Sequence, residues 1–257
     1  METTRSTIHF AGLTFRGLDV SDILPSGDDL KLVVTVNADF VVTSVRSARF
    51  RRIISDNYST FDGQVTWWLA KLLGRPRGVA AAKISGASVI HDLLSFARER
   101  AWNAFFLGAR SSVNEASVAI AKNKYGIEVR GYSPPFSDYP MSNTWNADVI
   151  DRILEFRPKL LFVALGSPKQ EYWLDDHRET LKRAGVALAM GCGGTLDFLS
   201  GSLRRAPTWM QSAGLEGVYR LAIEPKWFRV RRLGRSALVI PIALWYAMLD
   251  LAKIREQ

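Results

Sequence analysis

The apolar positions of this chain fall into two patterns that alternate along it. Short continuous apolar runs are typical of strands buried on both faces, and apolar residues spaced by three and four are typical of helices. We predict strands over residues 31–37, 79–85, 103–107, 127–132, 160–165 and 186–190. We predict helices over residues 40–54, 65–73 (largely buried), 89–100, 113–124 and 147–156, and one more after Pro168. This alternation predicts an α/β fold, in which a Rossmann-like parallel sheet carries helices on both faces.

The composition is that of a folded protein from a reducing compartment. The 257 residues are 47% hydrophobic, which is enough to bury a sizeable core in one large domain or two joined lobes. The single cysteine, Cys192, excludes an intramolecular disulfide and a metal site built from several cysteines. The N-terminus has no apolar segment long enough for a signal peptide, so we expect a cytoplasmic protein.

Positive charge is concentrated near the C-terminus. The formal net charge is +9, which indicates an acidic partner such as nucleic acid, anionic lipid or a phosphorylated small molecule. Between residues 204 and 235, eight Lys or Arg residues face only two Glu residues, so this segment holds +6 of the +9.

The basic segment is followed directly by an apolar one, residues 237–249. This apolar run is short of the roughly 20 residues that a membrane span needs, and Pro241 interrupts it. Basic residues beside an apolar interfacial segment are typical of a membrane-surface anchor. A solvated basic face followed by a core helix is the alternative. We therefore predict an α/β core over residues 1–208 and a basic, apolar, membrane-associating appendage over residues 209–257.

A polar turn follows the predicted strand at residues 160–165. Gly166 ends the apolar run, and Lys169, Gln170 and Glu171 come next, at the start of a helix. In an open parallel sheet such turns lie at the carboxyl edge, where ligands bind. An ordinary strand-to-helix turn with solvated side chains is the alternative.

A second glycine turn, at Gly108, is a candidate phosphate site. It precedes a helix, and free N–H groups at a helix start attract anions. Capping of that helix by Ser111 or Ser112 explains the turn equally well. The chain lacks the G-x-G-x-x-G and Walker patterns, which disfavours a dinucleotide oxidoreductase.

Asp62 is the first candidate for acid–base chemistry. It precedes Gly63 in a turn, where a carboxylate facing a cleft could deprotonate a hydroxyl group, although most Asp-Gly pairs are simply turns. Asp39, Glu171 and Asp197 are further candidates at predicted strand ends or turns. The three histidines show no paired spacing and no Asp-x-Asp occurs, so the sequence offers no visible metal ligands.

Several motifs, in order from about residue 31 to about residue 232, resemble those of the WecG/TagA/CpsF glycosyltransferases. The motifs are Thr35-Val36-Asn37-Ala38, Phe61-Asp62-Gly63, Ser85-Gly86, Phe106-Leu107-Gly108, Leu165-Gly166-Ser167-Pro168-Lys169-Gln170-Glu171, Gly193-Gly194-Thr195-Leu196-Asp197-Phe198, Gly201, Arg204-Arg205-Ala206-Pro207-Thr208-Trp209, Gly214-Leu215-Glu216, Tyr219-Arg220 and Glu224-Pro225. These bacterial enzymes transfer a sugar from a nucleotide donor to a polyprenyl-diphosphate-linked sugar.

The resemblance implies a fold of the GT-E type and a metal-independent, inverting transfer without a cofactor, for the synthesis of surface polysaccharide. It implies a UDP-sugar donor, a polyprenyl-diphosphate sugar acceptor, and a protein held peripherally at the inner face of the cell membrane. A homo-oligomer is compatible with it. The donor sugar stays open among N-acetylmannosamine, its uronic acid, glucose and other hexoses.

The resemblance also assigns roles to residues. Asp62 would be the general base, and the substrate-binding residues would be Thr35, Asn37, Lys83, Gly108, Gln170, Arg220, Arg229 and Arg232. The chain departs from the family pattern at three positions: Lys83 and Lys226 stand where arginine is usual, and Gly217 stands where an aromatic residue is usual. Lysine keeps the charge of arginine but loses its two-pronged grip on phosphate.

The sequence also bears on two other classes of function. A non-catalytic membrane-surface protein that binds a nucleotide or nucleotide-sugar is the main alternative, but it does not account for Asp62, Asn37 and Gln170 occurring together at their motif positions. Nucleic acid is not an expected partner, because the basic residues lie beside an apolar segment and no nucleic-acid-binding motif occurs.

Overall fold

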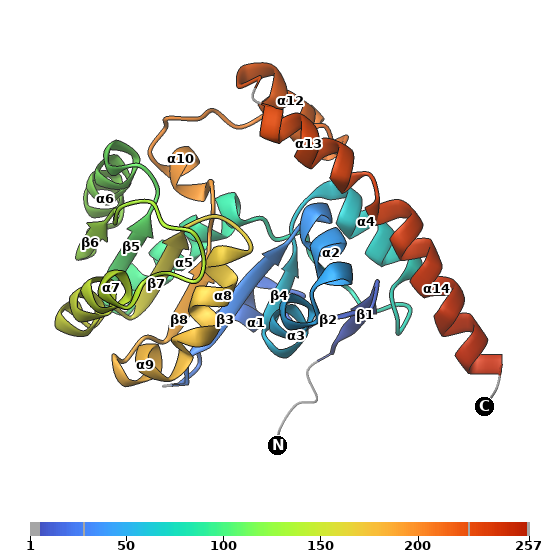
Figure 1. Cartoon of the computed structure of the whole chain (residues 1–257), viewed down its shortest axis with the longest axis horizontal. Coiled ribbons are helices and arrows are strands. Elements are labelled where there is room, and N and C mark those ends of the chain that lie inside the picture. The colour runs from blue at the N-terminus through green and yellow to red at the C-terminus, as the bar shows by residue number, and fades with distance from the viewer. Residues whose placement is uncertain (1–5, 28, 226, 256–257) are drawn as a thin grey trace. The chain divides into compact units, whose positions relative to one another are not determined.

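The structure, a computed structural model, describes residues 6–27, 29–225 and 227–255 (Figure 1). The described residues divide into two compact units. Unit 1 is formed by the described residues of the segments 1–22, 35–85 and 205–257, and unit 2 by those of the segments 23–34 and 86–204. The proposed boundary between a core and an appendage at residue 208 stays a prediction. Lys226, one of the departures from the family pattern, lies outside the described residues.

The sheet has six strands in the order β4-β3-β8-β7-β5-β6. The strands are β3 (Lys31–Val36), β4 (Tyr58–Phe61), β5 (Ala104–Gly108), β6 (Val129–Tyr132), β7 (Leu160–Ala164) and β8 (Leu188–Gly191). Strands β3, β8, β7, β5 and β6 pair in parallel, as the alternating pattern predicts. Only β4 belongs wholly to unit 1, and β3 carries the chain from unit 2 into unit 1.

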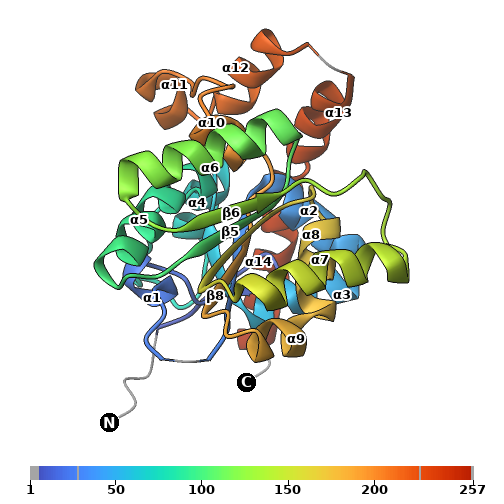
Figure 2. The same ribbon diagram turned by 90° about the vertical axis from the view of Figure 1, so that its left-hand side faces the viewer.

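Helices cover both faces of the sheet in unit 2. They are α5 (Gly86–Glu99), α6 (Ser111–Tyr125), α7 (Asn143–Phe156), α8 (Lys169–Asp176), α9 (Arg178–Arg183) and α10 (Thr195–Leu199). Helices α5 and α6 lie on one side of β5 and β6, and α7 lies on the other (Figure 2). This arrangement confirms the predicted α/β fold with helices on both faces.

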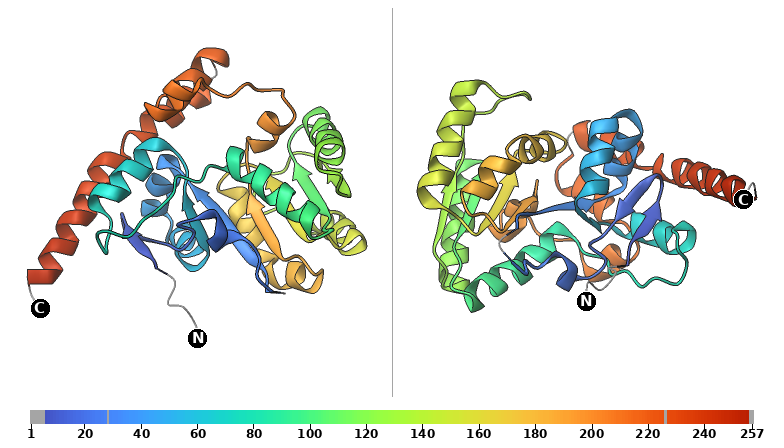
Figure 3. Two further views of the ribbon diagram at one scale, coloured as in Figure 1. Left: turned by 180° about the vertical axis from the view of Figure 1, so that it is seen from behind. Right: turned by 90° about the horizontal axis from the view of Figure 1, so that it is seen from below.

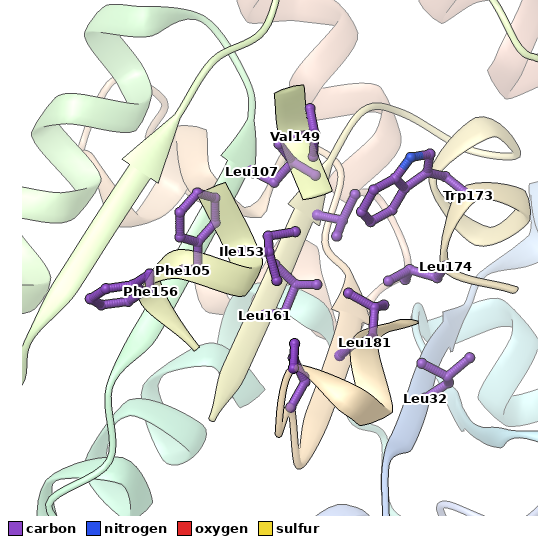
Figure 4. Packing of buried hydrophobic residues seen from close by; sticks show 14 of the residues in the cluster. Leu32, Phe105, Leu107, Val149, Ile153, Phe156, Leu161, Trp173, Leu174 and Leu181 are labelled. Carbon is purple, nitrogen blue, oxygen red and sulfur yellow. The ribbon is translucent and has the colours of Figure 1, made fainter. Parts of the chain in front are cut away.

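One hydrophobic cluster of unit 2 shows why these strands read as continuous apolar runs. Side chains from α7, α8 and α9, among them Ile153, Trp173 and Leu181, pack on Phe105 and Leu161 of the sheet (Figure 4). Strands β5 and β7 are buried almost throughout, because helices cover both of their faces.

Unit 1 contains the N-terminal hairpin and the C-terminal helices. Its elements, besides β4 and the end of β3, are β1 (Ile8–Phe10), β2 (Leu13–Phe15), α1 (Val20–Ile23, whose last residue falls in unit 2), α2 (Ala38–Arg46), α3 (Ala48–Asp56), α4 (Gln64–Leu73), α11 (Thr208–Ser212), α12 (Glu216–Ile223), α13 (Trp227–Ser236) and α14 (Val239–Arg255). The ring of Phe15 stacks on that of Phe61 at 4.0 Å between centroids, and Phe10 packs beside both, so the hairpin completes the core of this unit. Helix α14 packs along α2 and α4 (Figure 3).

Five features of local structure were predicted wrongly or missed. The single helix predicted over 40–54 is two helices, because Ser47 adopts an extended conformation and its hydroxyl caps α3 by accepting the N–H of Phe50. The strand predicted over 79–85 forms only one bridge, between Lys83 and Phe61. Its alanines offer little side-chain packing, which is what favours strands. Strand β4 was not predicted, because two of its four residues, Ser59 and Thr60, are polar although they are buried, so the strand is not a continuous apolar run.

The other two corrections concern helices. Helix α4 is not largely buried, since only Thr66 and Ala70 reach the core. Pro241 does not interrupt the apolar C-terminal segment, because it lies in the first turn of α14, where proline is tolerated.

Candidate functional site

A cavity of about 550 Å³ lies within unit 1, at the ends of β3 and β4. Six of the nine predicted site residues line it: Asn37, Asp62, Lys83, Arg220, Arg229 and Arg232. Its remaining walls come from the start of α4, from α12, from one face of α13 and from the start of α14. The C-terminal segment therefore forms part of this cavity together with the ends of two strands.

The backbone around Asp62 explains how the sequence positions this carboxyl group. The N–H of Asp62 donates to the carbonyl of Val36 at 2.9 Å, which fixes the residue beside the end of β3. Gly63 follows with φ +94°, a conformation that glycine adopts without strain, and serves as the N-cap of α4. The Asp-Gly pair therefore forms a turn, as most such pairs do, and in addition the carboxylate of Asp62 lines the cavity.

The pKa of Asp62 is raised, so this carboxyl group holds its proton more tightly than a solvated aspartate does. Burial is the main cause that raises its pKa from 3.8 to about 6, and the negative charge of Glu216 adds to the effect. The positive charges of Arg220, Arg232 and Arg205 oppose the shift without cancelling it. A carboxyl group with a pKa of about 6 is ionised at neutral pH and is more basic than a solvated aspartate, as a general base requires.

The cavity carries a surplus of positive charge. Five cationic side chains line it, namely those of Lys83, Arg205, Arg220, Arg229 and Arg232, against the two acidic side chains of Asp62 and Glu216. The lining residues therefore have a formal surplus of three positive charges. Such a surplus beside a carboxylate suits a ligand that carries both a hydroxyl group and a phosphate or diphosphate.

Acidic partners hold the arginines in place. Arg220 forms an ion pair with Glu216 at 3.1 Å one turn earlier on α12, and Arg229 pairs with Glu224. Arg232 reaches Asp39 at 3.3 Å. The guanidinium groups are thereby oriented before any ligand arrives, which lowers the entropy cost of binding.

Asp39 links α13 to the start of α2. Its carboxylate accepts a hydrogen bond from Nε of Arg235 at 2.6 Å and forms an ion pair with Arg232. Asp39 was predicted as a candidate acid or base, but its carboxylate is engaged by these two arginines. Its role in the structure is to hold the cationic face of α13 at the cavity.

Gly217 permits the close approach of α12 and α13. A Cβ atom at this position would lie 3.2 Å from Cδ1 of Leu233 on α13. A larger side chain, such as the aromatic residue usual in the family pattern, would need Leu233 to move. The departure at residue 217 therefore fits the local packing of this chain.

The other predicted residues of unit 1 have identifiable contacts. Asn37 caps α2, since its Oδ1 accepts from the N–H groups of Asp39 and Phe40. Nζ of Lys83 donates to Oε1 of Gln64 at 2.7 Å, which ties it to the first residue of α4. Thr35 is buried in β3 and does not line the cavity.

Gln170 and Gly108 lie in unit 2. Gln170 is only 3% exposed, and its Oε1 accepts from the N–H groups of Gly166 and Gly193, so it joins the turns that follow β7 and β8. Gly108 has φ +90°, and a Cβ atom there would lie 2.7 Å from the carbonyl oxygen of Ala164, so only glycine fits.

Helix α6, which follows Gly108, is not capped by a serine. The N-cap of α6 is Arg110, which makes no capping bond through its side chain, so capping by Ser111 or Ser112 was wrong. Arg110 instead forms an ion pair with Asp197 at 3.3 Å.

Two charged residues that line the cavity, Arg205 and Glu216, were absent from the predicted site. Both lie in the motifs that carry the family resemblance, which is the signal that could have identified them. Arg205 reaches Oγ of Ser85 at 3.5 Å, and Glu216 pairs with Arg220. Their presence at the cavity depends on α11–α13 folding back over the ends of β3 and β4, which local sequence patterns do not reveal.

Within residues 6–27, 29–225 and 227–255, no three His, Cys, Asp or Glu side chains form a group that could hold a metal ion. Over the same residues, one helical stretch, 229–252, is long and apolar enough to cross a membrane by length and composition. About a tenth of its most apolar window is buried inside the protein.

Comparison with known proteins gives a consistent result. The model of the "Glycosyl transferase WecG/TagA/CpsF family" matches residues 8–257. The chain is 30% identical over 201 residues to an N-acetylglucosaminyldiphosphoundecaprenol N-acetyl-beta-D-mannosaminyltransferase of Bacillus spizizenii, covering 77% of this chain and 74% of the relative. Proteins of the same name from Bacillus subtilis and Staphylococcus aureus are 29% and 27% identical, over 81% and 78% of this chain and 78% and 74% of those proteins.

Proposed function

Because this chain belongs to the WecG/TagA/CpsF glycosyltransferase family, we propose that it moves a hexose or N-acetylhexosamine-type sugar from a UDP-sugar to a polyprenyl-diphosphate-linked sugar. The product would serve the synthesis of bacterial surface polysaccharide. The observation that carries the proposal is the cavity of unit 1, where the basic carboxylate of Asp62 faces a cationic wall. The non-catalytic alternative is set aside, because the chain is a glycosyltransferase by family.

The proposed reaction is a single displacement with inversion. Asp62 accepts the proton of the acceptor hydroxyl group, whose oxygen attacks the anomeric carbon of the donor sugar. The bond between that carbon and the diphosphate oxygen breaks, and its electron pair leaves with UDP. A pKa of about 6 lets Asp62 be ionised before the step and still take the proton during it.

The reaction also requires that negative charge on the departing diphosphate be stabilised, and the arginines can do this. Arg220, Arg229 and Arg232 come from α12 and α13, and their guanidinium groups can each donate two hydrogen bonds to phosphate oxygens. The cationic wall supports a metal-independent transfer, because these charges can do at the diphosphate what a divalent ion does in other enzymes. Lys83 adds a further positive charge to the same cavity.

The proposed role of Gln170 and Gly108 is indirect in this structure. Gln170 positions the glycine turns after β7 and β8, and Gly108 allows a tight turn after β5. These turns lie at the carboxyl ends of parallel strands, where nucleotides bind in open α/β sheets. Thr35 and Asn37 would support the acceptor side, at the end of β3.

We also propose that residues 209–257 hold the protein peripherally at the inner face of the cell membrane. The names of the three relatives specify an undecaprenol-linked acceptor, and a lipid-linked substrate of that class would be reached at a bilayer surface. In α14, Val239 and Ala243 are each only 1% exposed, so one face of this helix packs on the protein and is not free for lipid on all sides. This favours a helix lying on the membrane over one that crosses it.

A product-mass experiment tests the proposed reaction. The protein is incubated with a panel of UDP-sugars and a short polyprenyl-diphosphate sugar, with EDTA present to remove divalent ions. We expect one donor to add the mass of its sugar to the acceptor, and Asp62→Asn to lower turnover by about 10²–10⁴-fold, the usual contribution of a general base. Near-normal turnover of that variant would refute the assignment of Asp62, and absence of product with every donor would refute the proposed reaction.

A further inference from the structure

Helix α4 exposes large apolar side chains on one face. Trp68 is 48% and Leu72 is 68% exposed, although the opposite side of the helix is held in the core by Thr66 and Ala70. Together with Val65, these residues occupy positions i, i+3 and i+7, so they form one stripe along the helix. This stripe was hidden in the sequence, where the same residues suggested a buried helix.

Helix α14 carries a matching stripe. Ile240, Leu244, Met248 and Leu251 are all about half exposed and recur at intervals of four, four and three. Their common direction lies about a third of a helical turn away from that of the buried residues Val239 and Ala243. Aspartate occurs at residue 250, outside this stripe, so the stripe itself is apolar throughout.

The two stripes begin at the same place. Val65 at the start of α4 and Ile240 at the start of α14 both line the cavity that holds Asp62. The two helices pack against each other, and their later residues lead away from the cavity toward the N-terminal hairpin (Figure 3). There, Gly74 just after α4 lies against Ile8, and the ring of Tyr246 in α14 lies against Gly12. Both stripes of exposed apolar side chains therefore begin at the cavity, on two helices that pack against each other.

Basic residues accompany the stripe of α4. Lys71 lies in its last turn, and Arg75 and Arg77 follow the helix directly. Exposed tryptophan and leucine next to basic side chains are the combination that binds the interface of an anionic bilayer, where the apolar groups enter the lipid and the cations meet the headgroups. Tryptophan in particular favours this interface, because its ring is apolar and its N–H is polar.

We propose that α4 is a second membrane-contacting element, in which Trp68 and Leu72 enter the surface of an anionic lipid bilayer beside α14. The membrane-contacting surface then consists of both stripes, and the cavity opens where they meet the bilayer. A polyprenyl-diphosphate acceptor would reach Asp62 with its diphosphate among the arginines and its lipid chain still in the membrane. The proposal rests on the proposed function in one respect, the lipid-linked acceptor, and extends the membrane contact beyond residues 209–257.

The natural cysteine content makes a direct test practical. Cys192 is the only cysteine and is buried, so a cysteine introduced at the surface is the one accessible thiol. We would label Leu72→Cys with a polarity-sensitive fluorophore and add vesicles of phosphatidylcholine and phosphatidylglycerol. Leu244→Cys on α14 is the reference for membrane contact, and Leu154→Cys on α7 of unit 2 is the matched control, an exposed leucine on a helix outside the proposed surface.

We expect the labels at residues 72 and 244 to shift to the blue and to be quenched by brominated lipid, and the label at residue 154 to do neither. A label at residue 72 that stays in water while that at residue 244 enters the lipid would overturn the proposal and leave the proposed function intact. A blue shift at residue 72 that needs no vesicles and grows with protein concentration would assign the surface to a second copy of the chain, and would also overturn it.

A second measurement separates this surface from the chemistry. We expect Trp68→Ser combined with Leu72→Ser to weaken partition into the vesicles about tenfold, equivalent to about 1.4 kcal/mol. Transfer to a short-chain, water-soluble acceptor should stay unchanged, because neither residue lines the cavity. If the double variant partitions into the vesicles as well as the unaltered protein does, the proposal is contradicted. If the unaltered protein transfers sugar to no acceptor, the proposed function is refuted, but the proposed membrane contact of α4 is not.

Discussion

Replacing Asp62 by asparagine should make the protein more stable at neutral pH while it removes activity. Asp62 is placed where its ionised form is poorly solvated, and burial raises its pKa from 3.8 to about 6. A carboxyl group whose pKa rises on folding favours the protonated native state, so its ionisation destabilises the fold. Asparagine has nearly the same shape and carries no charge, so it removes that cost.

The magnitude follows from the shift in pKa. The pKa rises by about 2 units between the unfolded and the folded chain, and each unit is worth about 1.36 kcal/mol, which gives about 3 kcal/mol. The cost is absent below pH 3.8, because Asp62 is then protonated in both states. Between about pH 4 and pH 6 the native state binds more protons than the unfolded state, so stability falls as the pH rises. Above about pH 6 the full cost applies.

The assay compares thermal unfolding of the two proteins at pH 4.5 and at pH 7.5. For a chain of this length, about 3 kcal/mol corresponds to a rise in Tm of about 6–12 °C for Asp62→Asn at pH 7.5. Most of that difference should vanish at pH 4.5, where Asp62 is still largely protonated in the folded protein. Asp148→Asn is the matched control, because the hydrogen bond from Tyr132 lowers the pKa of Asp148, so removal of its charge should not stabilise the protein.

Two results would refute this reasoning. If Asp62→Asn were no more stable than the unaltered protein at pH 7.5, burial would not be the cause of the raised pKa. If the gain in stability were the same at both pH values, it would come from packing and not from ionisation. A variant that is more stable but inactive would show that the ionised carboxylate needed for activity lowers the stability of the fold.

Two further perturbations act on the same site. Glu216→Gln should lower the pKa of Asp62 and move the acid limb of the kcat/KM profile below pH 6. Arg220→Gln should raise that pKa and move the acid limb to higher pH. If the acid limb moved in the same direction in both variants, the charges assigned to the cavity would be contradicted. Asp39→Asn removes the carboxylate that holds Arg232 and Arg235, and should lower kcat/KM about tenfold, or about 1.4 kcal/mol. Arg235→Gln breaks only one of those two pairs and should cost less, and an equal loss in both variants would argue against a positioning role for Asp39.

Much of the architecture was determined by the sequence itself. The apolar runs at β5 and β7 identify strands covered on both faces, and the helices between them follow from helical spacing. The order of the motifs identifies the family. The choice of Asp62 as the general base rests on its Asp-Gly motif together with that resemblance, and it stays a prediction. The strands, the helices between them and the family could be predicted because they depend on local patterns and on residue order, which the sequence states directly.

Local patterns failed where tertiary contacts override them. Strand β4 contains two buried polar residues, and their hydroxyl groups are satisfied by the carbonyls of Thr14 and Ile84, which are distant in sequence. The tryptophan-rich helix α4 was expected in the core, but only one side of it faces the core, and the direction of a side chain depends on what packs beside the helix.

The composition of the site was decided by the tertiary structure. The sequence supplies a carboxylate at residue 62, but only the folding of α12 and α13 over the ends of β3 and β4 places Glu216, Arg220 and Arg232 around it. The raised pKa of Asp62 follows from this burial and from the balance of those charges. Residues more than 150 positions apart in the chain set it, because electrostatic energy depends on distance in space and on exclusion of water, and neither is written in the local sequence.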